Sequence, residues 1–159
     1  MSPMGVEGVE DRLAGLGIEL PPVPSPVASY IPVVVSGGLA FVAGQIPLAS
    51  GELLARGKLG AELDAEAGAD AARRCAIQAL SALRAELGSL DRVRRIVRLT
   101  VFVASAPGFT DQPKVANGAS DLLGEVFGEL GKHARSAVGV TELPLGAPVE
   151  VEVTAEIEP

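Results

Sequence analysis

The residue best suited to carry chemistry is Arg135, in the stretch KHARSAVGV (132–140). It opens a run of small and apolar residues that is typical of a strand, and it lies two residues after His133, the only histidine. Arginine keeps its proton and presents a planar fork of donors that matches a carboxylate. Each charge-assisted hydrogen bond from a partly desolvated guanidinium contributes about 1.5–3 kcal/mol. We therefore expect Arg135 to hold a small acid or, as a purely structural alternative, to pair with Glu150 or Glu152.

The elements that must position Arg135 are predicted from hydrophobic periodicity and from turn and cap residues. Two β-rich runs around the turn at 36–38 indicate a hairpin. Asp64 can cap a long helix that ends at Gly88, with apolar residues at steps of three and four along one stripe. The predicted order is β-β-α-β-α-β-β, over 33–35, 39–43, 64–87, 94–103, 114–130, 135–141 and 149–157. This order indicates an α+β fold with both helices on one face of the sheet.

The N-terminal segment is predicted to be separate from this sheet. Residues 6–16 indicate a short amphipathic helix, and the four prolines between Pro21 and Pro26 indicate an extended arm. We assign residues 1–25 to an N-terminal extension and residues 26–159 to a single domain. The stretch from the end of the hairpin to about Leu63 is expected to be a glycine-punctuated loop.

Side-chain alternation describes the sheet face that the helices leave uncovered. We expect this second face to carry the glutamates of the last strand, together with Arg135, Ala137, Gly139, Ile96, Arg98, Thr100 and Phe102. Small and apolar residues do not suit a solvated face. We therefore interpret it as an interface between subunits, in which the acids find partners such as Arg98. The alternative is a sheet face open to solvent.

Composition and charge argue against several classes of protein. Thirteen Lys and Arg against twenty Asp and Glu give a net charge of −7, which repels a nucleic-acid backbone. No stretch is long and apolar enough for a membrane span, and the acidic N-terminal residues do not fit a secretory signal. The single cysteine, Cys75, is typical of a reducing cytoplasm, where we expect the protein. One cysteine and one histidine also argue against a zinc site within one chain.

Four stretches together resemble one family. HARSAVGVTELPLGAPVEVEV (133–153) resembles the C-terminal signature of the reactive intermediate deaminase family, also called RidA, YjgF-like or L-PSP endoribonuclease-like. GGLAFVAGQIPL (37–48) resembles its glycine, strand and Gly-Gln-Ile-Pro block, and Tyr30 lies fifteen residues before Gln45, as the family's tyrosine does. DRVRRIVRLTVFV (91–103) and VANGASDLLGEVFGE (115–129) are similar to its middle strand and second helix.

The resemblance implies a chorismate-mutase-like fold (bacillus type) and a homotrimer whose sheets form an inner β-barrel with clefts between subunits. It implies hydrolysis of reactive enamine or imine intermediates, such as 2-aminoacrylate, to a 2-oxo acid and ammonia, with no metal or organic cofactor. The implied partners are a small carboxylate-bearing substrate and two further copies of the chain. Composition and charge argue against a membrane or nucleic-acid partner.

The resemblance also implies roles for individual residues. Arg135 would bind the substrate carboxylate, and Glu150 would position or deprotonate the attacking water. Tyr30 would close the pocket or bond to the substrate, and Gly44 would allow close backbone approach. The remaining candidates are the amide of Ala137, the side chain of Asn117 and, as a gate or simply an exposed residue, His133.

The sequence departs from the family pattern at two positions. Ala43 stands where many members have serine, and Ala137 replaces a frequent cysteine. These changes keep open a trimeric binding or regulatory protein that holds a small carboxylic acid without turnover. A third class, an endoribonuclease or translation inhibitor, is disfavoured by the acidic charge and by the 3% aromatic content, because single-strand binding combines a basic groove with stacking rings.

Overall fold

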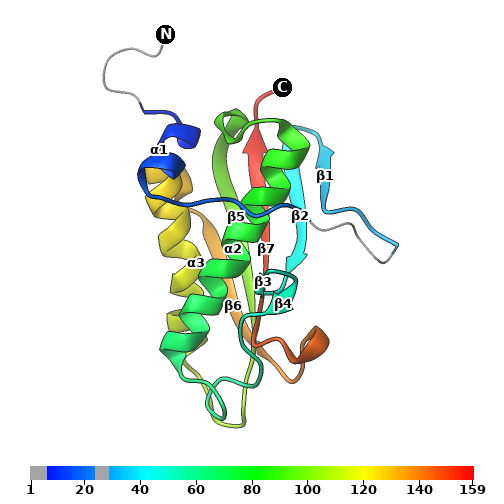
Figure 1. The fold of residues 1–159 in the computed structure, drawn as a ribbon, viewed down its shortest axis with the longest axis vertical. Coiled ribbons are helices and arrows are strands. Elements are labelled where there is room, and N and C mark those ends of the chain that lie inside the picture. The colour runs from blue at the N-terminus through cyan, green and yellow to red at the C-terminus, as the bar shows by residue number, and fades with distance from the viewer. Residues whose placement is uncertain (1–6, 24–28) are drawn as a thin grey trace.

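The computed structural model describes residues 7–23 and 29–159. Its main sheet has the strand order β1-β2-β7-β5-β6. The neighbours are antiparallel except β5 and β6, which are parallel and are connected through α3. The strands are β1 (Val33–Ser36), β2 (Leu39–Gln45), β5 (Val93–Ala104), β6 (Ala134–Val140) and β7 (Val149–Ile157). Both long helices, α2 (Ala65–Leu87) and α3 (Gln112–Phe127), cover the same face of the sheet (Figure 1). The predicted α+β fold and element order are confirmed.

Helix α2 begins and ends where its cap residues predict. The Asp64 carboxylate accepts a hydrogen bond of 2.9 Å from the amide of Ala67, and Gly88 ends the helix at φ 85°. A left-handed C-terminal residue favours glycine, because a side chain is strained there. Helix α3 ends earlier than expected, at Phe127, because Gly128 also adopts a positive φ, and a single 3-10 turn follows over 128–131.

The two helices pack closely because one contact uses a residue without a side chain. A Cβ atom placed on Gly118 of α3 would overlap the backbone carbonyl of Ala69 on α2. Below them, β7 presents Val149, Val151, Val153, Ala155 and Ile157 to the core, all buried. The core is thus assembled from alternate strand residues and one stripe of each helix.

Two details of the strands differ from the sequence prediction. The predicted loop after β2 contains a short hairpin, β3 (Leu48–Ala49) and β4 (Glu52–Leu53). Ile96 was expected on the second face, but it is fully buried in the core. The pairing of β5 with β7 shifts between Ile96 and Arg98, and this bulge resets the alternation. Arg98, Thr100 and Phe102 do lie on the uncovered face, opposite Thr154, Glu152 and Glu150.

The expected orientation of β6 was wrong. Arg135 pairs with the core residue Leu99 in register, and its side chain reaches α3 rather than the uncovered face. Ala137 packs against the core, and a Cβ on Gly139 would touch Gln112 of α3. Alternation separates two sets of residues but does not say which set faces the helices. On this edge strand, the set that contains Ser136, Val138 and Val140 faces away from the helices, and Val138 is 42% exposed.

The uncovered face carries apolar side chains beside acids. Val34 and Phe41 are about half exposed and lie in register with Thr154 of β7, so they share the face of Glu152. Arg98 donates a 2.7 Å hydrogen bond to the Ser136 hydroxyl on the same face rather than pairing with an acid. Nothing within the described protomer covers these residues.

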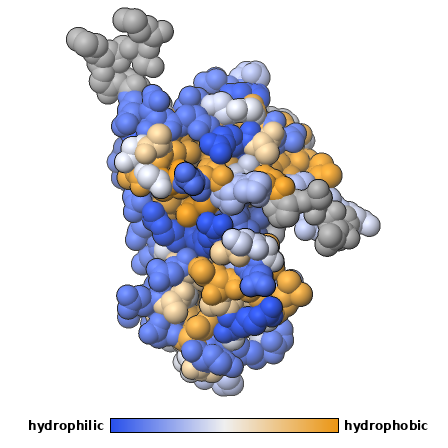
Figure 2. Space-filling view, viewed as in Figure 1, coloured by the Kyte–Doolittle hydropathy of each residue, from blue (hydrophilic) through white to orange (hydrophobic). Residues whose placement is uncertain are grey.

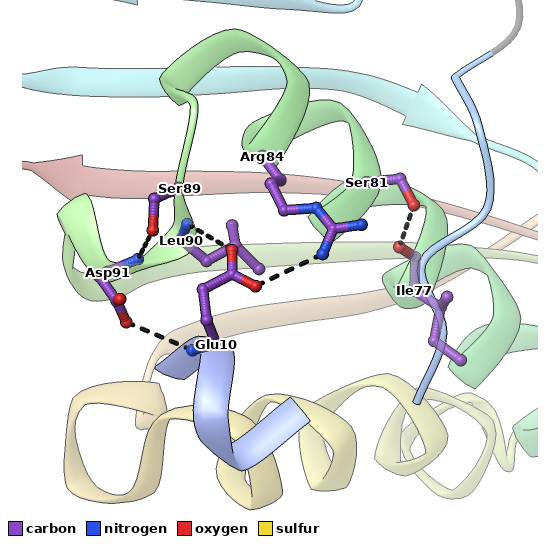
Figure 3. Close-up of polar contacts among 7 residues, drawn as sticks. All are labelled: Glu10, Ile77, Ser81, Arg84, Ser89, Leu90 and Asp91. Carbon is purple, nitrogen blue, oxygen red and sulfur yellow. Dashed lines mark hydrogen bonds and ion pairs between the residues drawn. The ribbon is translucent and has the colours of Figure 1, made fainter. Parts of the chain in front are cut away.

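A short helix, α1 (Val9–Gly15), docks beside α3 (Figure 1) and confirms the predicted N-terminal helix within the described residues. Gly8 at its N-terminus has no capping side chain, and Asp91 accepts from the amide of Glu10 instead, at 3.3 Å. The Glu10 carboxylate in turn accepts from the amide of Leu90 at 3.0 Å and from Arg84 Nη1 at 3.4 Å (Figure 3). These contacts attach the N-terminal segment to the domain.

The arm that follows α1 is described as far as Val23, and the prolines at 24 and 26 lie outside the described residues. No helix in the described ranges is long and apolar enough to cross a membrane.

Candidate functional site

Arg135 is held against α3 by oxygen atoms of three residues. Its Nη1 donates to Asn117 Oδ1 at 2.8 Å and to Ser120 Oγ at 3.1 Å, while Nη2 approaches the carbonyl of Pro113 at 3.5 Å. Asn117 and Ser120 are three residues apart and therefore lie on the same side of α3. The crossover helix between β5 and β6 thus positions the guanidinium at the β6 edge of the sheet.

His133 extends this network. Its Nδ1 lies 2.6 Å from the carbonyl of Gly131, and its Nε2 lies 2.9 Å from Ser120 Oγ. A carbonyl only accepts, so Nδ1 carries a proton, and in the neutral ring Nε2 is then the acceptor. The hydrogen-bond direction runs from Arg135 to Ser120, from the Ser120 hydroxyl to His133, and from His133 to Gly131. His133 thus orients Ser120, which sets the direction of one Arg135 bond.

The charge of Arg135 is not neutralised within the described chain. Its three recorded partners are neutral oxygens, and the ion pairs found among the described residues do not include it. The structural alternative of a pair with Glu150 or Glu152 is not found. A half-buried guanidinium that is oriented but not neutralised is suited to binding an anion.

Glu150 forms a second cluster, on the uncovered face. It is half-buried, and burial, followed by the neighbouring Glu152 carboxylate, raises its pKa. Its side chain lies over Gly44, since a Cβ built on Gly44 would come within 2.9 Å of Glu150 Cδ. Gly44 occupies the bulge where the β2–β7 register shifts. The glycine therefore leaves the space that the carboxylate occupies.

Tyr30 lies at the β1 edge of the sheet, far in sheet order from Arg135 on β6. It is 54% exposed and comes two residues before Pro32, whose carbonyl accepts from the amide of Ala43. The chain thus passes Tyr30 and enters the sheet beside Gly44.

The protomer therefore brings the expected site residues together in two groups rather than one. The Arg135 group contains Asn117 and, two residues along the strand, Ala137; the Glu150 group contains Gly44, with Tyr30 on the neighbouring segment. The two groups lie on opposite faces of the sheet. Ser120 belongs to the first group and was missed by the sequence prediction, although its spacing of three from Asn117 was a usable signal.

Comparison with known proteins identifies the family. Residues 10–157 match the family model described as "YjgF/chorismate_mutase-like, putative endoribonuclease". The chain belongs to this YjgF family. Enamine and imine deaminases are among its members. The match begins within α1 and includes both groups of candidate residues.

Three relatives show how the chain sits within the YjgF family. It is 49% identical to Protein TCP17 of Trypanosoma cruzi over 158 residues, covering 99% of each chain. It is 30% identical to Protein HMF1 of Saccharomyces cerevisiae, covering 83% of this chain and 87% of the other. The crystal structure of Atu1372 from Agrobacterium tumefaciens, a protein of unknown function, superposes with a TM-score of 0.87 at 42% identity, covering 95% and 94% of the two chains.

Proposed function

We propose that the protein hydrolyses reactive enamine and imine intermediates, such as 2-aminoacrylate, to 2-oxo acids and ammonia. The observation that carries the proposal is Arg135, a half-buried guanidinium oriented by Asn117 and Ser120 and lacking an ionic partner in the described chain. It would bind the substrate carboxylate with two charge-assisted hydrogen bonds. Family membership supports the choice of reaction, because deaminases of this class occur in the YjgF family.

The chemistry needs an acceptor for a proton of the attacking water. Glu150 suits this role because its pKa is raised and no cation lies close enough among the described residues to form an ion pair with it. The enamine tautomerises to the imine, which is protonated on nitrogen, and water adds to its C2 carbon while Glu150 takes one proton of the water. Glu150 then returns this proton to the nitrogen of the carbinolamine. The C–N bond breaks as the hydroxyl group gives its proton back to Glu150 and becomes the carbonyl, so that ammonia and the 2-oxo acid are released.

The two groups of residues meet if subunits associate edge to edge. Arg135 and Asn117 lie at the β6 edge, and Tyr30 lies at the β1 edge. In a closed ring such as a trimer, the β6 edge of one copy faces the β1–β2 side of the next. Arg135 of one subunit then shares a cleft with Tyr30, Gly44 and Glu150 of its neighbour. The exposed Val34, Phe41 and Val138 on the uncovered face are the apolar surface that such an assembly buries.

The test uses 2-aminoacrylate generated by a pyridoxal-phosphate-dependent serine dehydratase, with pyruvate release followed over time. The protein is expected to accelerate the release, and Arg135→Ala to abolish the acceleration. Arg73→Ala is the matched control, because Arg73 is a partly exposed α2 residue that pairs with Glu125 at 3.3 Å and has no hydrogen bond or ion pair with a residue of either group. It should keep full activity. No acceleration by the intact protein, or equal acceleration by Arg135→Ala, would refute the proposal.

A binding protein without turnover is the second candidate. The separation of Arg135 and Glu150 onto opposite faces favours it, because a protomer alone can bind a carboxylate but cannot bring the base to it. Calorimetry with pyruvate distinguishes the two functions. Binding that depends on Arg135, with no acceleration in the dehydratase assay, would support the binding protein.

A further inference from the structure

A cavity of about 400 Å³ lies between the N-terminal arm and α2, on the helix side of the sheet. Its walls are Pro21–Val23 of the arm, Gln45 at the end of β2, the region of the β3–β4 hairpin, and Arg74, Gln78 and Ser81 of α2. The arm crosses the helices in Figure 1, and the surface in Figure 2 is hollowed between the arm and the hairpin. None of these residues belongs to the Arg135 or Glu150 group. The cavity is therefore a separate feature.

Two α2 side chains hold the same residue of the cavity wall. Gln78 Oε1 accepts from the amide of Leu48 at 2.7 Å, and Arg74 Nε donates to the carbonyl of Leu48 at 2.6 Å. Arg74 and Gln78 are four residues apart and lie side by side on the helix. Gln78 uses its amide oxygen and Arg74 its Nε in these two hydrogen bonds, which hold both side chains at the cavity.

The unused ends of these side chains are all donors. No hydrogen bond or ion pair is recorded for the Arg74 terminal nitrogens or for Gln78 Nε2 among the described residues. The stretches outside the description, 1–6 and 24–28, contain no Asp or Glu that could neutralise Arg74. Gln78 is only 8% exposed, and its side chain lines the cavity. Ser81, by contrast, already donates to the carbonyl of Ile77 (Figure 3).

The arm side of the cavity is apolar, although Gln45, Ser50 and Ser81 also line the cavity. Pro21, Pro22 and Val23 form one wall, and proline has little conformational freedom to lose when a ligand binds. The arm is attached at its N-terminal side through α1, where Glu10 binds both Arg84 and Leu90 (Figure 3). The volume lies in the range of about 300–1,000 Å³ that is common for small-molecule pockets.

We propose that this cavity binds a small carboxylate with a short apolar tail. The carboxylate accepts hydrogen bonds from the terminal nitrogens of Arg74 and from Gln78 Nε2, and the tail packs against the prolines of the arm. An anion fits because the free ends of Arg74 and Gln78 are both donors and that of Arg74 carries a permanent charge. We infer the apolar tail from the apolar arm, because contact between the two removes apolar surface from water and so favours binding. Such a ligand joins the arm to α2 without touching the Arg135 group.

The test is calorimetric titration of hexanoate, with the neutral hexanamide as the matched probe. All proteins carry Arg135→Ala, which removes the proposed carboxylate site at Arg135. Arg74→Gln removes the charge while keeping a polar side chain of moderate length. Arg73→Gln, one residue away on the exposed side of α2, is the control. We expect one hexanoate per chain, affinity reduced about tenfold or more by Arg74→Gln, and no change with Arg73→Gln.

The neutral probe tests whether the charge of Arg74 contributes to binding. Hexanamide should bind at least about tenfold more weakly than hexanoate, because it offers no charge to the guanidinium. Absence of hexanoate binding, equal binding to the Arg74→Gln protein, or equal affinity for the two probes would each overturn the proposal. A hexanoate-soaked crystal structure gives the position directly, and density anywhere other than between Arg74 and the arm would also refute it.

Discussion

Asn117 on α3 and Arg135 on β6 are joined by a 2.8 Å hydrogen bond from the guanidinium to the amide oxygen. The bond orients the arginine and leaves its charge free, because the Asn117 amide is neutral. Asn117→Asp keeps the shape and replaces the acceptor by a carboxylate that pairs with Arg135. We expect KM for the imine substrate to rise about tenfold while the fold is unchanged. The measurement is the coupled dehydratase assay, with circular dichroism as the check on folding.

Unchanged KM in Asn117→Asp would contradict the role of Arg135 as the carboxylate ligand. Asn117→Ala is the companion variant. It removes the orienting bond without adding a charge, so its effect should be smaller than that of the aspartate. The ranking of the two variants separates neutralisation from loss of orientation.

Glu150 should set the acidic limb of the pH–rate profile. A general base must be unprotonated, and burial together with Glu152 raises the pKa of Glu150 above its usual range. As the pH is lowered, activity is therefore expected to fall. The midpoint of this fall should lie at a higher pH than it would if the base were an exposed glutamate. Glu152→Gln removes the second cause of the shift and should move the limb to lower pH. A limb that stays in place would show that another group titrates.

The raised pKa of Glu150 also affects the stability of the fold. A carboxyl whose pKa is raised by folding favours the native state only when protonated, so this stability is lost as the pH rises through the folded-state pKa. Glu150→Gln is therefore expected to be more stable than the natural protein at neutral pH. The difference should close near pH 4, at about the unfolded pKa of glutamate. Denaturant unfolding at the two pH values checks this, and a less stable Glu150→Gln at neutral pH would contradict it.

Gly44 is expected to act through Glu150. A methyl group at this position would come within 2.9 Å of the Glu150 side chain, and the glycine does not have a positive φ that would strain alanine. Gly44→Ala should therefore displace the carboxylate and lower kcat about tenfold or more, since displacement of a reacting group is costly. Binding of pyruvate through Arg135 should remain, as calorimetry can show. Equal loss of binding and turnover would point to a general disruption instead.

Gly118 should be essential for the packing of α2 on α3. A methyl group there would overlap the carbonyl of Ala69, and overpacking of this kind costs about 1–3 kcal/mol. Gly124→Ala on the same helix is the matched control, because nothing lies within 4 Å of its added methyl group. It should stabilise the protein by about 0.5–1 kcal/mol. Denaturant unfolding of both variants should give opposite signs, and equal signs would contradict the packing argument.

The uncovered sheet face should hold the subunits together. Light scattering is expected to give about three times the chain mass of 16.2 kDa. Phe41→Glu places a charge on this face, where Phe41 is 44% exposed in the protomer, and should shift the mass toward the monomer. Leu16→Glu, at a residue 45% exposed beside α1 on the helix side, is the control and should not. A stable monomer for the unaltered chain would refute the shared cleft.

The elements of the fold could be predicted because their signals are local. Asp64 and Gly88 bound α2 through contacts with the adjacent turn, and the strict alternation of β7 gives its buried row without reference to any other strand. The β3–β4 hairpin was missed because two residues per strand are too few to show a period. Ile96 was misplaced because a bulge in one strand depends on the register of its partner.

The sequence by itself determined which residues could do the chemistry: an arginine at the start of one strand, a glutamate at the start of the next, and a glycine before Gln45. The tertiary structure decided how they are grouped. It set Arg135 against Asn117 and Ser120 on the helix side and Glu150 over Gly44 on the other face. The physical reason is that alternation is a property of one strand, whereas the face that each set occupies depends on the packing of the helices and on the pairing of distant strands. The same dependence on packing places Arg74 and Gln78 in a cavity whose other wall comes from residues some fifty positions earlier in the chain.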